Sequence, residues 1–186
     1  MTNSVVTITF EKLQMQGDVT CNGRNGAGIY GCNEGSLATV IMNNCAMTGD
    51  VYGGYETASL CGWIGNKATV SGCWSVGTVE APRNEQSYFI APTSVTLKNC
   101  FSLNGDAYNV NKITDEIAAS GEMTFTLNGN QENIVWYQTI GEDNYPVLDN
   151  THKQVYSDGE YSCDGTLLSE TAVYSNEGSN NIADHE

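Results

Sequence analysis

The chain has 186 residues, of which 40% are hydrophobic by type, and its 22 Asp and Glu against 7 Lys and Arg give a formal net charge of −15. This length suffices for one domain with its own core and a smaller appended part. The charge argues against nucleic acid and anionic membrane surfaces as partners. No stretch reaches the roughly 18 consecutive apolar residues of a membrane helix, so we expect no membrane insertion.

The N-terminal residues MTNSVVTITFEKL lack the basic start, apolar stretch and cleavage site of a secretory signal. They enter strand-like alternation almost at once, which suits a piece excised from a longer chain. We therefore expect flanking domains of the same polypeptide, and we give the missing signal no weight.

One short pattern recurs along the first part of the chain. It reads VTITFEKLQMQGDV from Val6, ATVIMNNCAMTGDV from Ala38, ATVSGCWSVGTV from Ala68 and SVTLKNCFSLNGDA from Ser94. The three later copies place Cys45, Cys73 and Cys100 where the first copy has Leu13. Because free Cys packs as a small hydrophobe and Leu replaces it, this position is predicted to be a buried apolar stacking site.

A second phrase lies between these copies and completes a longer repeating unit. It reads GIYG from Gly28, SLCG from Ser59 and YFIA from Tyr88. Each unit of about 28 to 32 residues then holds short segments rich in Val, Thr and Ile, separated by Gly, Asn and Asp turns. A propeller blade needs more residues, so the sequence predicts an all-β fold, a β-solenoid with one repeat per coil over residues 1–113.

The seven cysteines cannot all pair within one chain, because their number is odd. A zinc site would need Cys pairs at close spacing with His nearby, and the two histidines, His152 and His185, are far from any such pair. We therefore expect no metal ligation by these cysteines, and no cofactor.

The repeats resemble the GLUG motif. Gly28-Ile-Tyr-Gly31 followed by Asn33 and Gly35, and then Asn44-Cys45-Ala46-Met47-Thr48-Gly49, match its pattern, and the resemblance covers roughly residues 5–107. Departures are Ser59 for the first Gly, Ala91-Pro92 for the second Gly of the last copy, and Gly72 in place of Asn. The resemblance implies a non-catalytic repeat region of a secreted or surface-attached bacterial protein, adhesin-like in kind.

After Val110 the pattern changes. Thr114 to Gly121 reads as one short helix with a capping Thr, and Met123–Leu127, Ile134–Tyr137 and Tyr145–Leu148 read as strands. The run from Leu127 also resembles the segment that closes GLUG arrays. We expect residues 114–150 to cap the open end of the last coil, and residues 151–186 to form a hairpin-like tail and a disordered linker to a following module.

Catalysis is not expected. The candidate carboxylates Asp18, Asp50 and Asp106 recur once per repeat, with Thr78 in the remaining copy, and such repetition is typical of a turn, whereas acid-base chemistry needs an asymmetric pair. Two alternatives stay open, a polysaccharide-active β-helix enzyme and calcium bound by the Asp row.

Binding is the main rival to a purely structural role. If each Cys points inward, the following Trp74 and Phe101 point outward and could form an exposed aromatic platform for a glycan or a host surface protein. The other interpretation is that the rings lie in a core or under the cap. The function expected first is thus an extracellular or cell-surface spacer and scaffold module, and the alternative is a binding module with Trp74 and Phe101 as ligand-binding residues.

Overall fold

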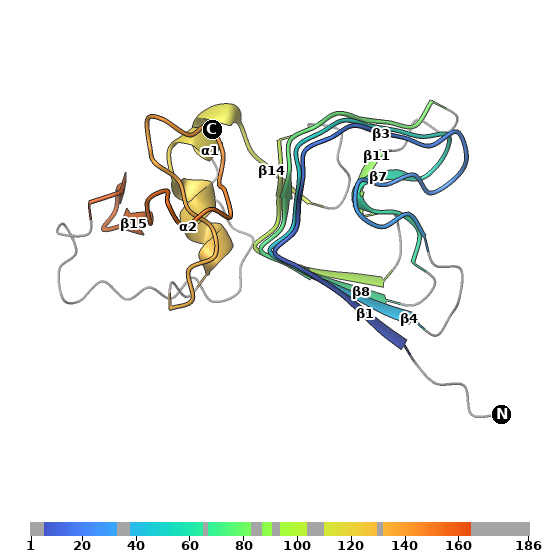
Figure 1. Ribbon diagram of the computed structural model, residues 1–186, viewed down its shortest axis with the longest axis horizontal. Coiled ribbons are helices and arrows are strands. Elements are labelled where there is room, and N and C mark those ends of the chain that lie inside the picture. The colour runs from blue at the N-terminus through green and yellow to red at the C-terminus, as the bar shows by residue number, and fades with distance from the viewer. Residues whose placement is uncertain are drawn as a thin grey trace. The chain divides into compact units, whose positions relative to one another are not determined.

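The computed structural model describes residues 6–32, 38–64, 67–82, 87–90, 94–103, 110–129 and 132–164. The chain divides into two compact units, residues 1–112 and residues 113–186. Strands dominate the described residues, as the predicted all-β class requires, and the sheets of the first unit are parallel (Figure 1).

The longest strands of the four copies form one parallel sheet in chain order, β1–β4–β8–β12. The strands are β1 (Val6–Glu11), β4 (Ala38–Asn43), β8 (Lys67–Ser71) and β12 (Ser94–Lys98). Val6 pairs with Ala38, Val40 with Ala68 and Ala68 with Val95, so partners lie 32, 28 and then 27 residues apart. This register aligns the repeated pattern copy by copy, as the sequence predicts.

The shorter strands of each copy form three further parallel sheets. A five-stranded sheet contains β2 (Gln14–Met15), β5 (Ala46–Met47), β9 (Trp74–Ser75), β13 (Phe101–Ser102) and β14 (Asn111–Lys112). A three-stranded sheet contains β3 (Val19–Thr20), β6 (Val51–Tyr52) and β10 (Val79–Glu80), and β7 (Thr57–Cys61) pairs with β11 (Ser87–Ile90). In Figure 1 the successive copies overlay one another along this path.

The corner after the first strand of each copy has the same left-handed backbone. The φ angle is 52° at Lys12, 54° at Asn44 and 50° at Asn99, and Gly72 has 61°. Gly and Asn tolerate this conformation better than other residues. The replacement of Asn by Gly at position 72, a departure from the repeat pattern, therefore leaves the turn unchanged.

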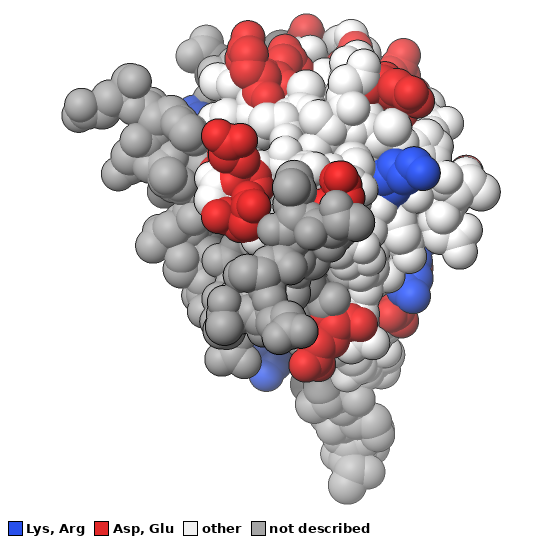
Figure 2. Space-filling view, turned by 90° about the vertical axis from the view of Figure 1, so that its left-hand side faces the viewer, with Lys and Arg blue, Asp and Glu red and all other residues white. Residues whose placement is uncertain are grey.

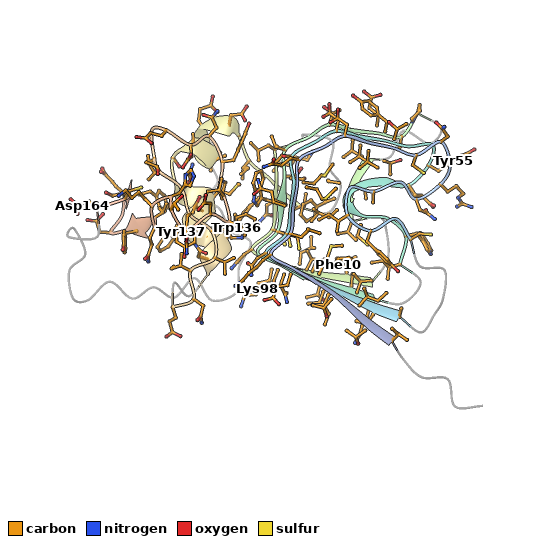
Figure 3. All side chains as sticks on the ribbon, in the orientation of Figure 1. Phe10, Tyr55, Lys98, Trp136, Tyr137 and Asp164 are labelled. Atoms are coloured by element: carbon orange, nitrogen blue, oxygen red, sulfur yellow. The ribbon has the colours of Figure 1, made fainter. Side chains whose placement is uncertain are left out.

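The core of the first unit lies between its sheets. Cys45, Cys73 and Cys100 are fully buried in one stack, which confirms the predicted apolar ladder, and Leu13 at its end is 36% exposed. Around them pack apolar side chains from the neighbouring strands, namely Val40, Met42, Met47, Val51, Leu60, Ile64, Val70, Phe89 and Ile90. The half-buried Phe10 lies against Tyr30, with ring centroids 5.4 Å apart (Figure 3).

The second unit begins with two helices, where the sequence predicts one. Thr114 caps α1 (Asp115–Ala119) as expected, because its hydroxyl accepts the Ile117 N–H. The strand predicted over Met123–Leu127 is wrong, since these residues belong to α2 (Glu122–Asn128). Gly121, with φ 96°, lets the chain turn between the helices, and the apparent alternation reflects threonines that are buried together with Met123 and Leu127.

The remainder of the second unit is irregular apart from one hairpin. β15 (Tyr156–Ser157) pairs antiparallel with β16 (Tyr161–Ser162), and Tyr137 exchanges backbone hydrogen bonds with Val147. Among the described residues, no helix has the length and hydrophobicity that crossing a membrane requires. The predicted linker, Ala91-Pro92 and Asp106 lie outside the described residues.

Candidate functional site

The two aromatic residues predicted to bind a ligand lie side by side, on neighbouring strands. Phe101 of β13 pairs in register with Trp74 of β9, and both residues have 0% of their surface exposed. Neither belongs to the core cluster that holds Cys73 and Cys100. The predicted exposed platform is therefore wrong: alternation correctly turns the rings away from the cysteine ladder, but they are buried there, as the alternative interpretation had it.

The repeated aspartates bond from one copy to the next. An Asp18 carboxylate oxygen accepts the backbone N–H of Asp50 at 2.9 Å, and an Asp50 oxygen accepts the N–H of Thr78 at 2.7 Å. Each carboxylate thus satisfies a backbone donor of the following copy, at the corner just before β6 and β10. The expected bond to a nearby backbone group is present, but the partner lies about 30 residues away in the chain.

A shallow pocket of about 210 Å³ lies beside this corner. Its lining residues are Thr20, Cys21, Asn22, Tyr52, Gly53, Gly54, Glu80 and Pro82. The Tyr52 hydroxyl donates to Asp50 at 3.4 Å, and the negative charge of Asp50, with that of Glu80, raises the pKa of Tyr52. A tyrosine held protonated beside carboxylates is a poor base, so the pocket offers hydrogen-bonding groups without an acid-base pair.

The stacked cysteines carry thiols that are held in the protonated form. Each donates to the carbonyl two residues before it, Cys45 to Asn43 at 3.4 Å and Cys73 to Ser71 at 3.3 Å. Burial raises the pKa of Cys73 well above its ordinary value, and burial likewise raises the pKa of Cys61. Because the thiolate is the reactive species, these groups are unreactive in the folded protein.

Thiol labelling should separate the seven cysteines into two groups. We expect the exposed Cys32 to react quickly in the native protein, and the half-buried Cys21 and Cys163 to react more slowly. The four buried cysteines, Cys45, Cys61, Cys73 and Cys100, should react only in denaturant. Mass spectrometry of peptides after a short alkylation measures this, and rapid native labelling of Cys45, Cys73 and Cys100 would contradict the ladder.

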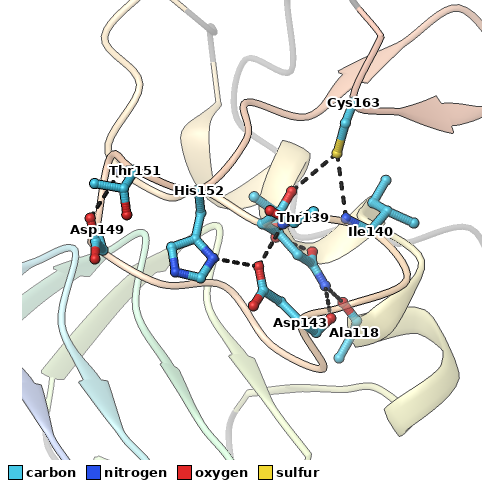
Figure 4. Close-up of polar contacts among 10 residues, drawn as sticks. Ala118, Thr139, Ile140, Asp143, Asp149, Thr151, His152 and Cys163 are labelled. Atoms are coloured by element: carbon cyan, nitrogen blue, oxygen red, sulfur yellow. Dashed lines mark hydrogen bonds and ion pairs between the residues drawn. The ribbon is translucent and has the colours of Figure 1, made fainter.

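The second unit contains a compact set of polar contacts that the sequence did not predict (Figure 4). The His152 ring lies 2.7 Å from an Asp143 oxygen, which also accepts the Thr139 N–H at 2.6 Å. Next to it, the buried Gln138 side chain donates to the carbonyls of Ala118 and Asp143 and accepts from the Thr124 hydroxyl. These bonds fix the irregular segment after α2 onto the helices.

Cys163 approaches the same segment but does not form a nucleophile-base pair with His152. Its thiol donates to the Gln138 carbonyl at 3.2 Å and accepts the Ile140 N–H at 3.4 Å. A nucleophilic cysteine needs its thiol directed at a base. We therefore assign this set of contacts a structural role.

The His152–Asp143 contact makes stability depend on pH. The hydrogen bond to Asp143 raises the pKa of His152. Burial alone would raise the pKa of Asp143, but its bonds to Thr139 and His152 lower it on balance. Stability from the raised histidine pKa is complete below its ordinary value of about 6.5 and is lost as pH rises through the folded value. Stability from the lowered aspartate pKa is lost as pH falls below its ordinary value of about 3.9.

We accordingly expect the wild-type protein to lose stability between about pH 5.5 and pH 8, and His152→Gln to remove that part of the dependence. Urea unfolding at several pH values measures it. A variant with the same pH profile as the wild type would show that the contact contributes nothing.

The chain's similarity to known proteins gives no guide to these features. The sequence matches no family model, no curated protein and no solved structure. Within the described residues, no group of three or more His, Cys, Asp or Glu side chains is placed to hold a metal ion. The acidic residues on the face seen in Figure 2 form several separate groups.

Proposed function

We propose that the first unit is a β-solenoid of GLUG-like repeats that serves as a non-catalytic spacer and scaffold module of a larger secreted or cell-surface bacterial protein. The observation that carries this proposal is how the repeated polar residues are used. Asp18 and Asp50, the groups best suited to chemistry, accept backbone N–H groups of the following copy. Their repetition therefore serves the stacking of copies.

The buried residues support the same conclusion. Side chains at equivalent positions of successive copies stack on one another, and the interior hydroxyls of Ser75 and Ser102 bond to each other at 3.2 Å. A protein that buries every copy against its neighbours gains length with each repeat, at about 4.8 Å per parallel strand. Burial of the cysteine thiols also suits an oxidising exterior, because it shields them from oxidants.

The second unit is proposed to cover the end of the array. An uncovered last coil exposes unpaired backbone groups and invites aggregation. The helices of this unit and the buried Trp136 give it a compact structure of its own. Glycan binding through Trp74 and Phe101 is not proposed, because both rings are buried.

The proposal can be tested by removing one repeat. Deleting residues 39–66 joins Ala38 to Lys67, and Lys67 is the register partner of Thr39, so every following strand keeps its face. We expect a folded monomer that melts cooperatively, in which Asp18 bonds to Thr78. Fluorophores at the two ends of the first unit should approach each other by about 4.8 Å.

The matched control deletes one residue fewer, residues 39–65. The register then slips by one position, and each strand turns its apolar residues outward. We expect this variant to be insoluble or unfolded by circular dichroism. If both deletions fold equally well, or if neither folds, the stacked-repeat architecture is wrong.

A further inference from the structure

The first repeat has an open side whose residues resemble an interior. Ile8, Phe10 and Met15 are only half-buried, whereas their register partners Val40, Met42 and Met47 are completely buried. Val6 is 54% exposed. Among the residues that the structure describes, β1, β2 and β3 each form the edge of a sheet on this side.

Glycines on the open side have space that their partners lack. A methyl group built on Gly49 would overlap the carbonyl of Gly17, and one built on Gly62 would overlap the carbonyl of Gly31. In the first repeat itself, a methyl group on Gly17 meets nothing within 4 Å, and its φ is not left-handed. Neither local crowding nor backbone conformation requires glycine at position 17, but another backbone stacked on this side would require it.

The sheet of longest strands ends at β12, and this far edge complements the near one. Val95 and Leu97 are half-buried and occupy the same ladders as Ile8 and Phe10. The ladder that begins with Glu11 runs through Asn43 and Ser71 and ends at Lys98. Both charged residues are exposed, so the two edges place apolar residues opposite apolar ones and a carboxylate opposite an ammonium group.

We propose that the open side of the first repeat is a docking surface for the last repeat of a second copy of this chain, joined head to tail in the register of the repeats. In this arrangement β12 of one copy pairs parallel with β1 of the next, and Lys98 lies beside Glu11. The inference rests on the stacked-repeat architecture proposed above. Because such an interface joins two different surfaces, it does not close and generates an open-ended assembly.

The net charge of −15 on each copy opposes this association. At physiological ionic strength the Debye length is about 8 Å, so distant charges are screened while charges in contact are screened much less. The docked edges would form their hydrogen bonds with apolar residues alongside. Association is therefore expected to strengthen between low and physiological salt.

The test measures the mass of the full chain by sedimentation over a wide range of concentration. We expect the average mass to rise without stopping at a dimer. Gly17→Ala should lower the association constant roughly tenfold or more, because its methyl group meets the incoming carbonyl. It should leave the melting temperature unchanged, since the side chain has room in the monomer.

Charge exchange identifies the partner surface. Glu11→Lys alone and Lys98→Glu alone place like charges opposite each other and should each weaken association roughly two- to fivefold, and the double variant should restore it. A wild type that stays monomeric overturns the proposal, as does an assembly that stops at a dimer or ignores Gly17→Ala. In either case the deletion of residues 39–66 can still fold, so the failure of the docking surface and the failure of the repeat architecture are distinguishable.

Discussion

Replacing Gly49 by Ala is expected to lower the free energy of unfolding by about 3 kcal/mol. Its methyl group would overlap the backbone carbonyl of Gly17 in the preceding copy, and that carbonyl cannot move away as a flexible side chain could. The two copies would have to separate locally, which would also disturb the hydrogen bond from the Asp50 N–H to Asp18. Urea unfolding followed by circular dichroism measures the loss.

The control is Gly17→Ala, which makes the same chemical change one copy earlier. Because a methyl group there meets nothing within 4 Å, we expect a change within about 0.5 kcal/mol. Equal losses from both substitutions would show that glycine serves a local backbone preference and not the close stacking of copies.

Trp74→Ala is expected to destabilise the protein by about 3 to 5 kcal/mol, because it removes a completely buried ring and leaves a cavity. The melting temperature should fall by many degrees. Trp63→Ala serves as the control, since Trp63 is only half-buried and should cost less.

The same variant decides whether Trp74 binds glycans. If Trp74→Ala kept its melting temperature and lost binding on a glycan array, the ring would be an accessible ligand contact, contrary to its burial here. Loss of stability identifies it as a core residue.

The repeated part of the fold could be predicted because one signal is written several times. The spacing of Cys45, Cys73 and Cys100 with Leu13 gave the ladder, since parallel in-register strands stack equivalent residues. The burial of Trp74 could not be predicted in the same way. Alternation tells which way a side chain points relative to the interior, but it does not tell what covers the other face.

The second unit shows a further limit. Met123–Leu127 alternates apolar residues with threonines, which favours a strand by pattern, yet it is a helix with both threonines buried. The Thr124 hydroxyl has a partner in Gln138, and only the tertiary structure supplies that partner. The Asp143–His152 contact was missed because it joins two positions of an irregular segment, where spacing carries no geometric information.

The unequal intervals between paired strands have a consequence for how such a gene can change. Partners lie 32, 28 and 27 residues apart, yet the pairing between the long strands keeps its register throughout. The differences in length are therefore absorbed in the connections. Unequal recombination between copies need not preserve one fixed period, because a duplication is acceptable whenever its junction restores the phase of the next strand. Small insertions should thus accumulate between the strands, while a single-residue insertion within β4 or β8 should be eliminated by selection.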